Sequence, residues 1–250
     1  MKISVIIPTL NEAQKIATLI DYLYTHWGEY IYTIIVVDGW SKDETTSLAK
    51  QAWVTVLTSP PSRAIQMNLW AAHAHDIYTW TEDHYIRFVH ADVMPPTSFA
   101  IDINTATQWW ATAWCFMTRY DTTDQALLKT TTNRTKYDHW LFRMWGQTLR
   151  MRSDDFWNLW WYDESMIVCE EIDLFRKIYK NPDITFMNIK KEILVSARKH
   201  EINGAHWTNF IYLCIYLMYR LGFSQKSMIS FYTKTIKSER LASVNEYTKN

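Results

Sequence analysis

Acidic and basic side chains follow the ends of apolar runs in the first half of this chain. Residues 8–12 (Pro-Thr-Leu-Asn-Glu) close the first run, Asp38 closes the second, and residues 90–92 (His-Ala-Asp) close a later one. A carboxylate such as Asp38 can accept hydrogen bonds from a ribose or a base. Asp92 can bind Mg²⁺ or Mn²⁺, which prefer oxygen ligands and bridge diphosphate oxygens. Arg63 can neutralise the same diphosphate with two parallel N–H donors.

Each of these residues also has a purely structural interpretation. Asn11 and Asp38 can cap helices, because their side-chain oxygens accept hydrogen bonds from backbone N–H groups. Asp92 can order the loop before Pro95, and Arg63 can be a solvated charge at the start of a helix. Residue type alone leaves both interpretations open, so the position of these residues in the fold matters.

Short runs rich in valine and isoleucine alternate with helical patterns over the first half. Residues 2–7, 32–37, 54–58 and 85–89 are almost continuously apolar, which is typical of buried parallel strands. Apolar residues recur at helical spacing over residues 12–26. Asn11 with Gln14, and Ser41 with Glu44, have the spacing of capping boxes at two helix starts. Because parallel strands end at one edge of a sheet, we expect the segments of chemical interest to converge there. A dinucleotide-binding turn is excluded, since no G-x-G-x-x-G follows the first strand.

The second half contains fewer clear signals. Residues 171–179 predict a helix, 184–189 and 192–197 predict extended segments, and 207–221 predict a strongly apolar helix. Residues 121–137 are polar and lack periodicity, which predicts a surface excursion. The tail after Lys234 is polar.

Bulk properties restrict the class of protein. Of 250 residues, 48% are apolar and 21% charged, which suffices for a folded core. The 26 basic and 26 acidic residues cancel, so no overall field favours a nucleic-acid partner. Cys115, Cys169 and Cys214 are odd in number and widely spaced, which indicates reduced thiols. The first residues form a strand-like run without the pattern of a signal peptide, so we expect a cytoplasmic protein.

The segment from Ile3 to Thr45 resembles the family 2 glycosyltransferases, whose first strand ends in P-x-x-N-E and whose second ends in V-D-G-S-x-D-x-T. Residues 63–68 (RAIQMN) and 90–92 (HAD) resemble segments of a bacterial subgroup of that family. The resemblance implies a GT-A fold, that is, one α/β domain with a Rossmann-like, mostly parallel sheet flanked by helices, followed by an apolar C-terminal helix. The nucleotide-binding residues that it implies are Pro8, Thr9, Asn11, Glu12, Asp38, Gly39 and Arg63.

The same resemblance implies a catalytic and a metal-binding role. Asp92 stands where the family carries its D-x-D motif and would bind Mg²⁺ or Mn²⁺. Residues 169–174 (CEEIDL) resemble M-E-D-x-E-L, whose second acid is the general base of inverting relatives, and this role falls to Glu171. The residues implied on the acceptor or leaving-group side are His90, Gln147, Glu170 and Arg198.

The resemblance covers about residues 3–225 and implies transfer of a sugar, with inversion, from a nucleoside diphosphate sugar to a hydroxyl acceptor. We assign residues 1–205 to the transferase domain and 206–250 to a C-terminal helical extension and polar tail. The apolar stripe of Phe210, Leu213, Leu217 and Leu221 can pack on the domain or on a second subunit. It can also dock at the inner face of a membrane, toward a lipid-linked acceptor. A helix needs about 20 apolar residues to span a bilayer, and the apolar run from Phe210 to Tyr219 is shorter than that.

Tryptophan recurs where the family carries glycine. The chain has 14 Trp and 5 Gly, and Trp40, Trp53, Trp114, Trp160 and Trp161 occupy family glycine positions. An indole cannot supply the positive φ or the close backbone approach for which glycine is used. We hypothesise that these codons are UGA, read as glycine in the cell; UGG codons in the gene would contradict this.

Two other classes remain as alternatives. A non-catalytic nucleotide-sugar-binding or scaffolding protein is favoured if the tryptophans are genuine and Glu171 is misplaced. A haloacid-dehalogenase-type phosphatase is suggested by Asp38-Gly39, but that chemistry needs a D-x-D sequence, and Gly39-Trp40 does not provide it.

Overall fold

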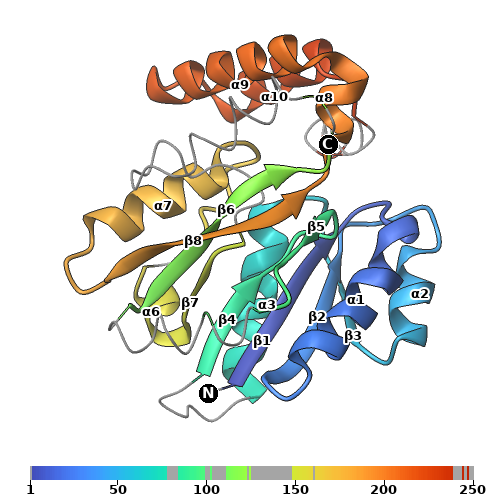
Figure 1. The fold of residues 1–250 in the computed structure, drawn as a ribbon. Helices are drawn as coiled ribbons and strands as arrows, with labels where there is room; N and C mark the ends of the chain where they lie inside the picture. Colours follow the sequence, from blue (N-terminus) through green and yellow to red (C-terminus); the bar gives the residue numbers. More distant parts are fainter. Residues whose placement is uncertain are drawn as a thin grey trace.

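The computed structural model describes residues 2–77, 84–98, 102, 111–122, 124, 148–159, 161–238, 244 and 247. Gln147, Trp160 and most of residues 121–137 lie outside this set. The described residues form an eight-stranded mixed sheet with helices against both faces and a group of helices beyond one end (Figure 1).

The first four strands are parallel, as the sequence predicted, and they lie side by side in the order β3-β2-β1-β4. Helices connect them in the manner of parallel βαβ units. The elements of this half are β1 (Lys2–Thr9), α1 (Ala13–Trp27), β2 (Ile31–Asp38), α2 (Thr45–Gln51), β3 (Thr55–Thr58), α3 (Arg63–Ile77) and β4 (His84–Phe88).

The second half of the sheet introduces antiparallel pairs, so the sheet is mixed rather than parallel throughout. The order continues β7-β6-β8-β5, with β4–β7, β6–β7 and β5–β8 antiparallel and β6–β8 parallel. The two extended segments expected at 184–189 and 192–197 form one strand, β8, whose pairing register shifts between Phe116 and Met117 of β6. The elements are β5 (Val93–Met94), β6 (Ala113–Tyr120), β7 (Arg150–Arg152), α6 (Ser153–Asn158), α7 (Glu170–Lys180) and β8 (Phe186–Val195).

Two apolar clusters hold the helices to the sheet. On one face, Ile16, Leu19, Ile20 and Leu23 of α1 are buried at the spacing that the sequence showed. On the other face, α3, α6 and α7 cover the same strands. Because β1, β2 and β4 are parallel neighbours, their carboxyl ends lie at the same edge of the sheet, where ligands bind in open α/β sheets.

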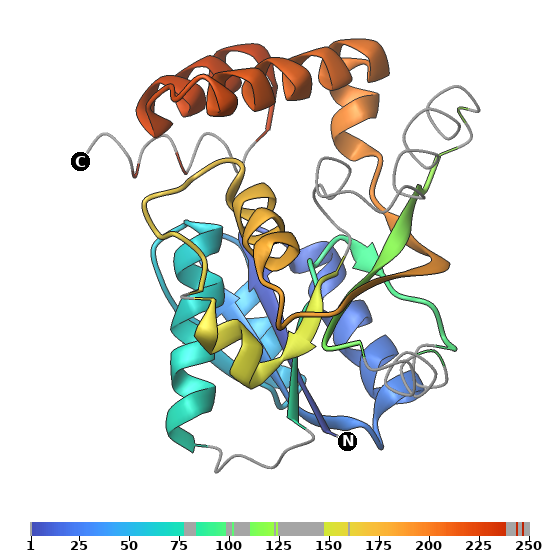
Figure 2. The same ribbon diagram turned by 90° about the vertical axis from the view of Figure 1, so that its left-hand side faces the viewer.

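The last described helices are α8 (Arg198–Asn203), α9 (Ala205–Arg220) and α10 (Gln225–Thr235). Both views show α9 and α10 running side by side as a layer beyond the end of the sheet (Figures 1 and 2). Ile211 and Ile215 of α9 pack with Met228 and Ile229 of α10 in a third apolar cluster. Among the described residues, none of the helices combines the length and hydropathy needed to cross a bilayer.

Three tryptophans have backbone conformations that favour glycine. Six non-glycine residues described here have positive φ, and half of them are tryptophan: Trp40 at 65°, Trp53 at 59° and Trp161 at 61°. Trp53 follows the last turn of α2, where its N–H bonds to the carbonyl of Lys50, at a position that helices commonly fill with glycine. A bulky residue in this region is strained. Trp114 differs, because it lies in β6 without a positive φ.

Candidate functional site

The loops after β1 and β2 are joined by side-chain hydrogen bonds. Asp38 accepts hydrogen bonds from the hydroxyl of Thr9 at 3.1 Å and from the N–H of Ser41 at 2.8 Å. Asn11, at φ 54°, donates its N–H to the hydroxyl of Ser41 and accepts the N–H of Lys42, each at 2.8 Å. The two loops therefore form one rigid unit at the sheet edge.

The predicted capping boxes are wrong. The residues at the N-caps of α1 and α2 are Glu12 and Glu44, and neither makes a side-chain capping bond. The backbone N–H groups at the start of α1 instead donate to side chains from the segment after β2. The N–H of Glu12 donates to the hydroxyl of Thr45 at 2.8 Å, and the N–H of Ala13 donates to the carboxylate of Asp43 at 3.1 Å. Hydrogen bonds to Thr45 and Ala13 contribute to a lowered pKa of Asp43, against the opposing effect of burial. Sequence spacing missed this because the partners lie 30 and 33 positions away, in the loop after β2 and at the start of α2.

Gly39 and Gln66 bring the ends of β1 and β2 close together. A Cβ on Gly39 would lie 3.0 Å from Cα of Pro61 and 3.1 Å from Nε2 of Gln66, so any side chain there would crowd these neighbours. Gln66 of α3 donates to the carbonyls of Thr9 at 2.9 Å and Val37 at 2.7 Å. This bonding explains why a glutamine stands in the RAIQMN segment, although the sequence had singled out only Arg63 from it.

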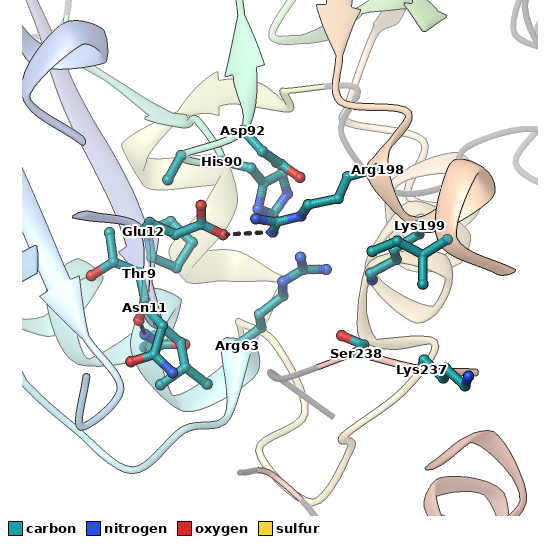
Figure 3. A pocket seen from close by; sticks show the side chains of 15 residues that line it. Thr9, Asn11, Glu12, Arg63, His90, Asp92, Arg198, Lys199, Lys237 and Ser238 are labelled. Atoms are coloured by element: carbon teal, nitrogen blue, oxygen red, sulfur yellow. Dashed lines mark hydrogen bonds and ion pairs between the residues drawn. The ribbon is translucent and has the colours of Figure 1, made fainter. Parts of the chain in front are cut away.

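Arg63 and Asp92 line the same cleft (Figure 3). Arg63 begins α3, and its guanidinium lies 4.0 Å from the carboxylate of Glu170. Burial opposes the charge of Asp92, but His90, Arg63 and Lys199 together hold the pKa of Asp92 below its ordinary value. Asp92 is therefore an anion among cations.

His90 and Glu171 form a buried pair. Nε2 of His90 lies 2.8 Å from Oε1 of Glu171, and the two residues are 5% and 7% exposed. If Glu171 is ionised, His90 must carry its hydrogen on Nε2 to donate it. His90 follows β4 and Glu171 begins α7, so the fold brings together residues 81 positions apart.

The far wall of the cleft comes from α8 and the segment after α10. Arg198 lies 3.5 Å from the carboxylate of Glu12, across the cleft (Figure 3). Lys199 and Lys237 line the same space, so several cations surround the two acids Glu12 and Asp92. Such a cleft attracts a ligand that carries phosphate.

Asn68 is a positioning residue that sequence reasoning did not assign. Its side-chain N–H groups donate to the carbonyl of Tyr162 at 2.8 Å and the carboxylate of Glu164 at 3.1 Å, and it accepts the N–H of Tyr162 at 3.0 Å. These bonds fix the turn that leads to α7. The signal that could have found Asn68 was its place in the RAIQMN segment.

The sequence-predicted residues divide by location. Those that line the cleft are Pro8, Thr9, Asn11, Glu12, Arg63, His90, Asp92 and Arg198. Asp38 and Gly39 lie behind it, bonded to Thr9. Glu170 and Glu171 contact Arg63 and His90, which line the cleft. Gln147 lies outside the described residues.

A divalent ion fits this cleft only together with a ligand. Among the residues the structure describes, no group of three or more His, Cys, Asp or Glu side chains could hold a metal. Mg²⁺ is commonly bound through one or two carboxylates plus substrate phosphates. Asp92, held ionised among cations, offers one such carboxylate, and phosphate oxygens would complete the site.

The fold is shared with several solved glycosyltransferases. A mannosyltransferase from Pyrobaculum calidifontis, in complex with GDP-Man and Mn²⁺, has a TM-score of 0.61 and 14% identity, over 99% of this chain and 68% of that one. TarS from S. aureus, in complex with UDP-GlcNAc, has a TM-score of 0.60 and 15% identity, over 92% and 70%. Glucosyl-3-phosphoglycerate synthase from Mycobacterium tuberculosis has a TM-score of 0.59 and 15% identity, over 89% and 80%.

Comparison of the sequence with curated proteins finds no match. Residues 4–214, most of the chain, match the family described as glycosyl transferase family 2. The sheet, the paired strand-end loops and this match agree, and the chain belongs to glycosyltransferase family 2.

Proposed function

We propose that this protein transfers a sugar from a nucleoside diphosphate sugar to a hydroxyl acceptor, with inversion and with the help of a divalent metal. The observation that carries the proposal is the cleft itself, where Glu12, Arg63, Asp92 and Arg198 surround one space at the carboxyl ends of β1 and β4. Solved structures of similar fold bind UDP-GlcNAc or GDP-Man, which supports a nucleotide-sugar donor.

The donor would lie along the loops after β1 and β2. Thr9, Asn11 and Glu12 would face the nucleoside, with Pro8 shaping the strand end and Asp38 and Gly39 holding the loop from behind. Arg63 would neutralise the diphosphate, assisted by Arg198. Arg198 is half exposed and bonded to Glu12, so it must turn from this partner to reach a phosphate.

Asp92 would bind Mg²⁺ or Mn²⁺ together with the diphosphate. A bound metal would stabilise the negative charge of the leaving group. The solved structures that hold Mn²⁺ beside a nucleotide support this choice of cofactor.

Glu171 would act as general base. Its carboxylate takes the proton of the acceptor hydroxyl as that oxygen bonds to the anomeric carbon, and the bond from that carbon to the diphosphate breaks on the opposite face. Inversion follows from this single displacement. His90 would hold Glu171 through the 2.8 Å contact, while Glu170 keeps Arg63 in place. Gln147 remains a proposed acceptor-side residue.

The acceptor would approach the cleft from the C-terminal side, since Lys237 and Ser238 help to line it. We propose that residues 1–205 form the transferase domain and 206–250 an extension beside the cleft, which Lys237 and Ser238 help to line. A lipid-linked acceptor at the inner face of a membrane would fit this arrangement.

The direct test is transfer or hydrolysis of UDP- and GDP-sugars by the purified protein with Mn²⁺. We expect turnover that Asp92→Ala and Glu171→Gln abolish, while Glu192→Gln, a change at a partly exposed carboxylate of β8, leaves it intact. Donor binding should survive in Glu171→Gln and weaken in Asp92→Ala. If no donor is turned over and Asp92→Ala binds nucleotide normally, the assignment is wrong.

A non-catalytic nucleotide-sugar-binding protein is the second candidate. Two observations favour it: Trp40 has a strained backbone in the donor loop, and Glu171 is engaged by His90 rather than lining the cleft. Calorimetry separates the two, because this candidate binds a nucleotide sugar without consuming it.

A further inference from the structure

Helix α9 and the turn after it carry an exposed apolar stripe. Ile211 and Ile215 face the third apolar cluster and are 1% exposed. The opposite side of the helix and the adjoining turn expose large apolar side chains, each about half exposed or more: Trp207, Phe210, Leu213, Leu217, Leu221 and Phe223. Contiguous apolar surface of this kind marks an interaction site.

The segment that carries this stripe has charged side chains of one sign. The nearest acidic residues lie outside it, at Glu201 and Glu239 in sequence and at Asp173 of α7, which accepts a hydrogen bond from Tyr219. Residues 202–238 contain Arg220, Lys226, Lys234 and Lys237 and no Asp or Glu, although the whole chain has as many acidic as basic residues. Arg220, Lys226, Lys234 and Lys237 are all exposed. Arg220 ends α9 at the edge of the stripe, and Lys226 and Lys234 lie on the neighbouring α10.

We propose that α9 and α10 dock this protein on the surface of an anionic phospholipid bilayer. Helices that lie in a membrane interface combine aromatic and leucine side chains on one face with Lys and Arg beside them. Because residues 202–238 carry basic but no acidic side chains, an anionic surface is favoured over a second copy of the same segment, since two such segments would repel each other. The occupant is thus the membrane rather than a twin subunit.

The position of the helices connects this surface with the cleft. Ile202, which is 58% exposed, and Lys237 line the cleft and lie immediately beside the docking helices in sequence. The layer of α9 and α10 thus begins and ends, along the chain, beside residues that line the cleft. The inference deepens the proposed function by placing its acceptor at the bilayer, but the surface itself rests on α9 and α10 alone.

The test is flotation of the purified protein with vesicles of phosphatidylglycerol and phosphatidylcholine in equal parts, compared with phosphatidylcholine alone. We expect binding to the anionic vesicles, weak binding to the neutral ones, and loss of binding as salt is raised. Phe210→Ser/Leu213→Ser/Leu217→Ser should lower the partition coefficient by about tenfold or more. Leu69→Ser, at a partly exposed leucine of α3, is the matched control and should bind like the wild type.

A second variant keeps the test decisive if the triple variant does not fold. Lys226→Glu/Lys234→Glu changes only exposed side chains and should weaken binding to anionic vesicles while leaving turnover of a water-soluble acceptor unchanged. Equal binding of this variant would overturn the electrostatic part of the proposal. The proposal of membrane docking would be overturned if the wild type did not float with anionic vesicles. It would also be overturned if the protein sedimented as a dimer and Leu213→Ser prevented that dimer from forming. Either result leaves the transferase assignment standing, because that is measured without lipid.

Discussion

Replacing Trp53 tests whether the backbone at this position favours glycine over tryptophan. The residue has φ 59° and its side chain is 94% exposed, so its removal loses almost no packing. A left-handed conformation costs a residue with a Cβ roughly 1–2 kcal/mol, and glycine avoids this cost. Glycine also makes the unfolded chain more flexible, which offsets about 0.5–1 kcal/mol of that gain. We therefore expect Trp53→Gly to stabilise the protein by about 1 kcal/mol.

The assay is urea unfolding of three proteins: the wild type, Trp53→Gly and Trp53→Ala. Alanine removes the same indole but keeps the Cβ, so it should leave stability nearly unchanged. A gain of about 1 kcal/mol raises the melting temperature of a chain of this size by roughly 2–4 °C. If Trp53→Gly is no more stable than Trp53→Ala, the backbone argument fails. If a peptide of the protein from its own cell contains tryptophan at position 53, glycine there is excluded.

Four further outcomes follow from the site. Asp92→Asn should remove the gain in UDP or GDP affinity that Mn²⁺ provides, measured by calorimetry with and without the metal; an unchanged gain would exclude Asp92 as a ligand. The pKa of Asp92 is held below its ordinary 3.8, so its charge is lost only as the pH falls through that lower value. The Mn²⁺-dependent affinity for a nucleotide sugar, whose diphosphate has no group that titrates near neutral pH, should therefore stay level between pH 7 and about pH 5; a loss near pH 6 would contradict this. His90→Gln should lower kcat far more than it raises KM and should shift the pH profile of kcat, because His90 orients Glu171; an unchanged profile would leave His90 a structural role only. Asn68→Ala removes three hydrogen bonds from the turn before α7 and should destabilise the protein by about 1–3 kcal/mol in urea unfolding; full stability would show that the turn holds without it.

Local pattern was sufficient for the first half of the fold. The apolar runs at 2–7, 32–37, 54–58 and 85–89 form the parallel strands β1 to β4, because strands buried on both faces are almost continuously apolar in sequence. The exception is β3, which lies at the edge of the sheet and is partly exposed. The convergence of strand-end segments followed from topology, and Thr9, Glu12, Arg63 and Asp92 do line one cleft. The family resemblance implied glycine at positions 40, 53 and 161, and the tryptophans there have positive φ, whereas Trp114, from the same inference, does not and Trp160 lies outside the described residues.

Contacts between distant segments were decided only in three dimensions. The capping-box prediction failed at α1 because Asp43, in the loop after β2, and Thr45, at the start of α2, accept the hydrogen bonds of its first backbone N–H groups. The antiparallel strands β5 and β7 are too short to leave a periodic signal, so the mixed character of the sheet was hidden. The pairing of His90 with Glu171 likewise joins the end of β4 to the start of α7. The sequence by itself determined which residues could do chemistry and where the strands end. The tertiary structure decided which of those residues touch, because hydrogen bonds form between neighbours in space, whatever their separation along the chain.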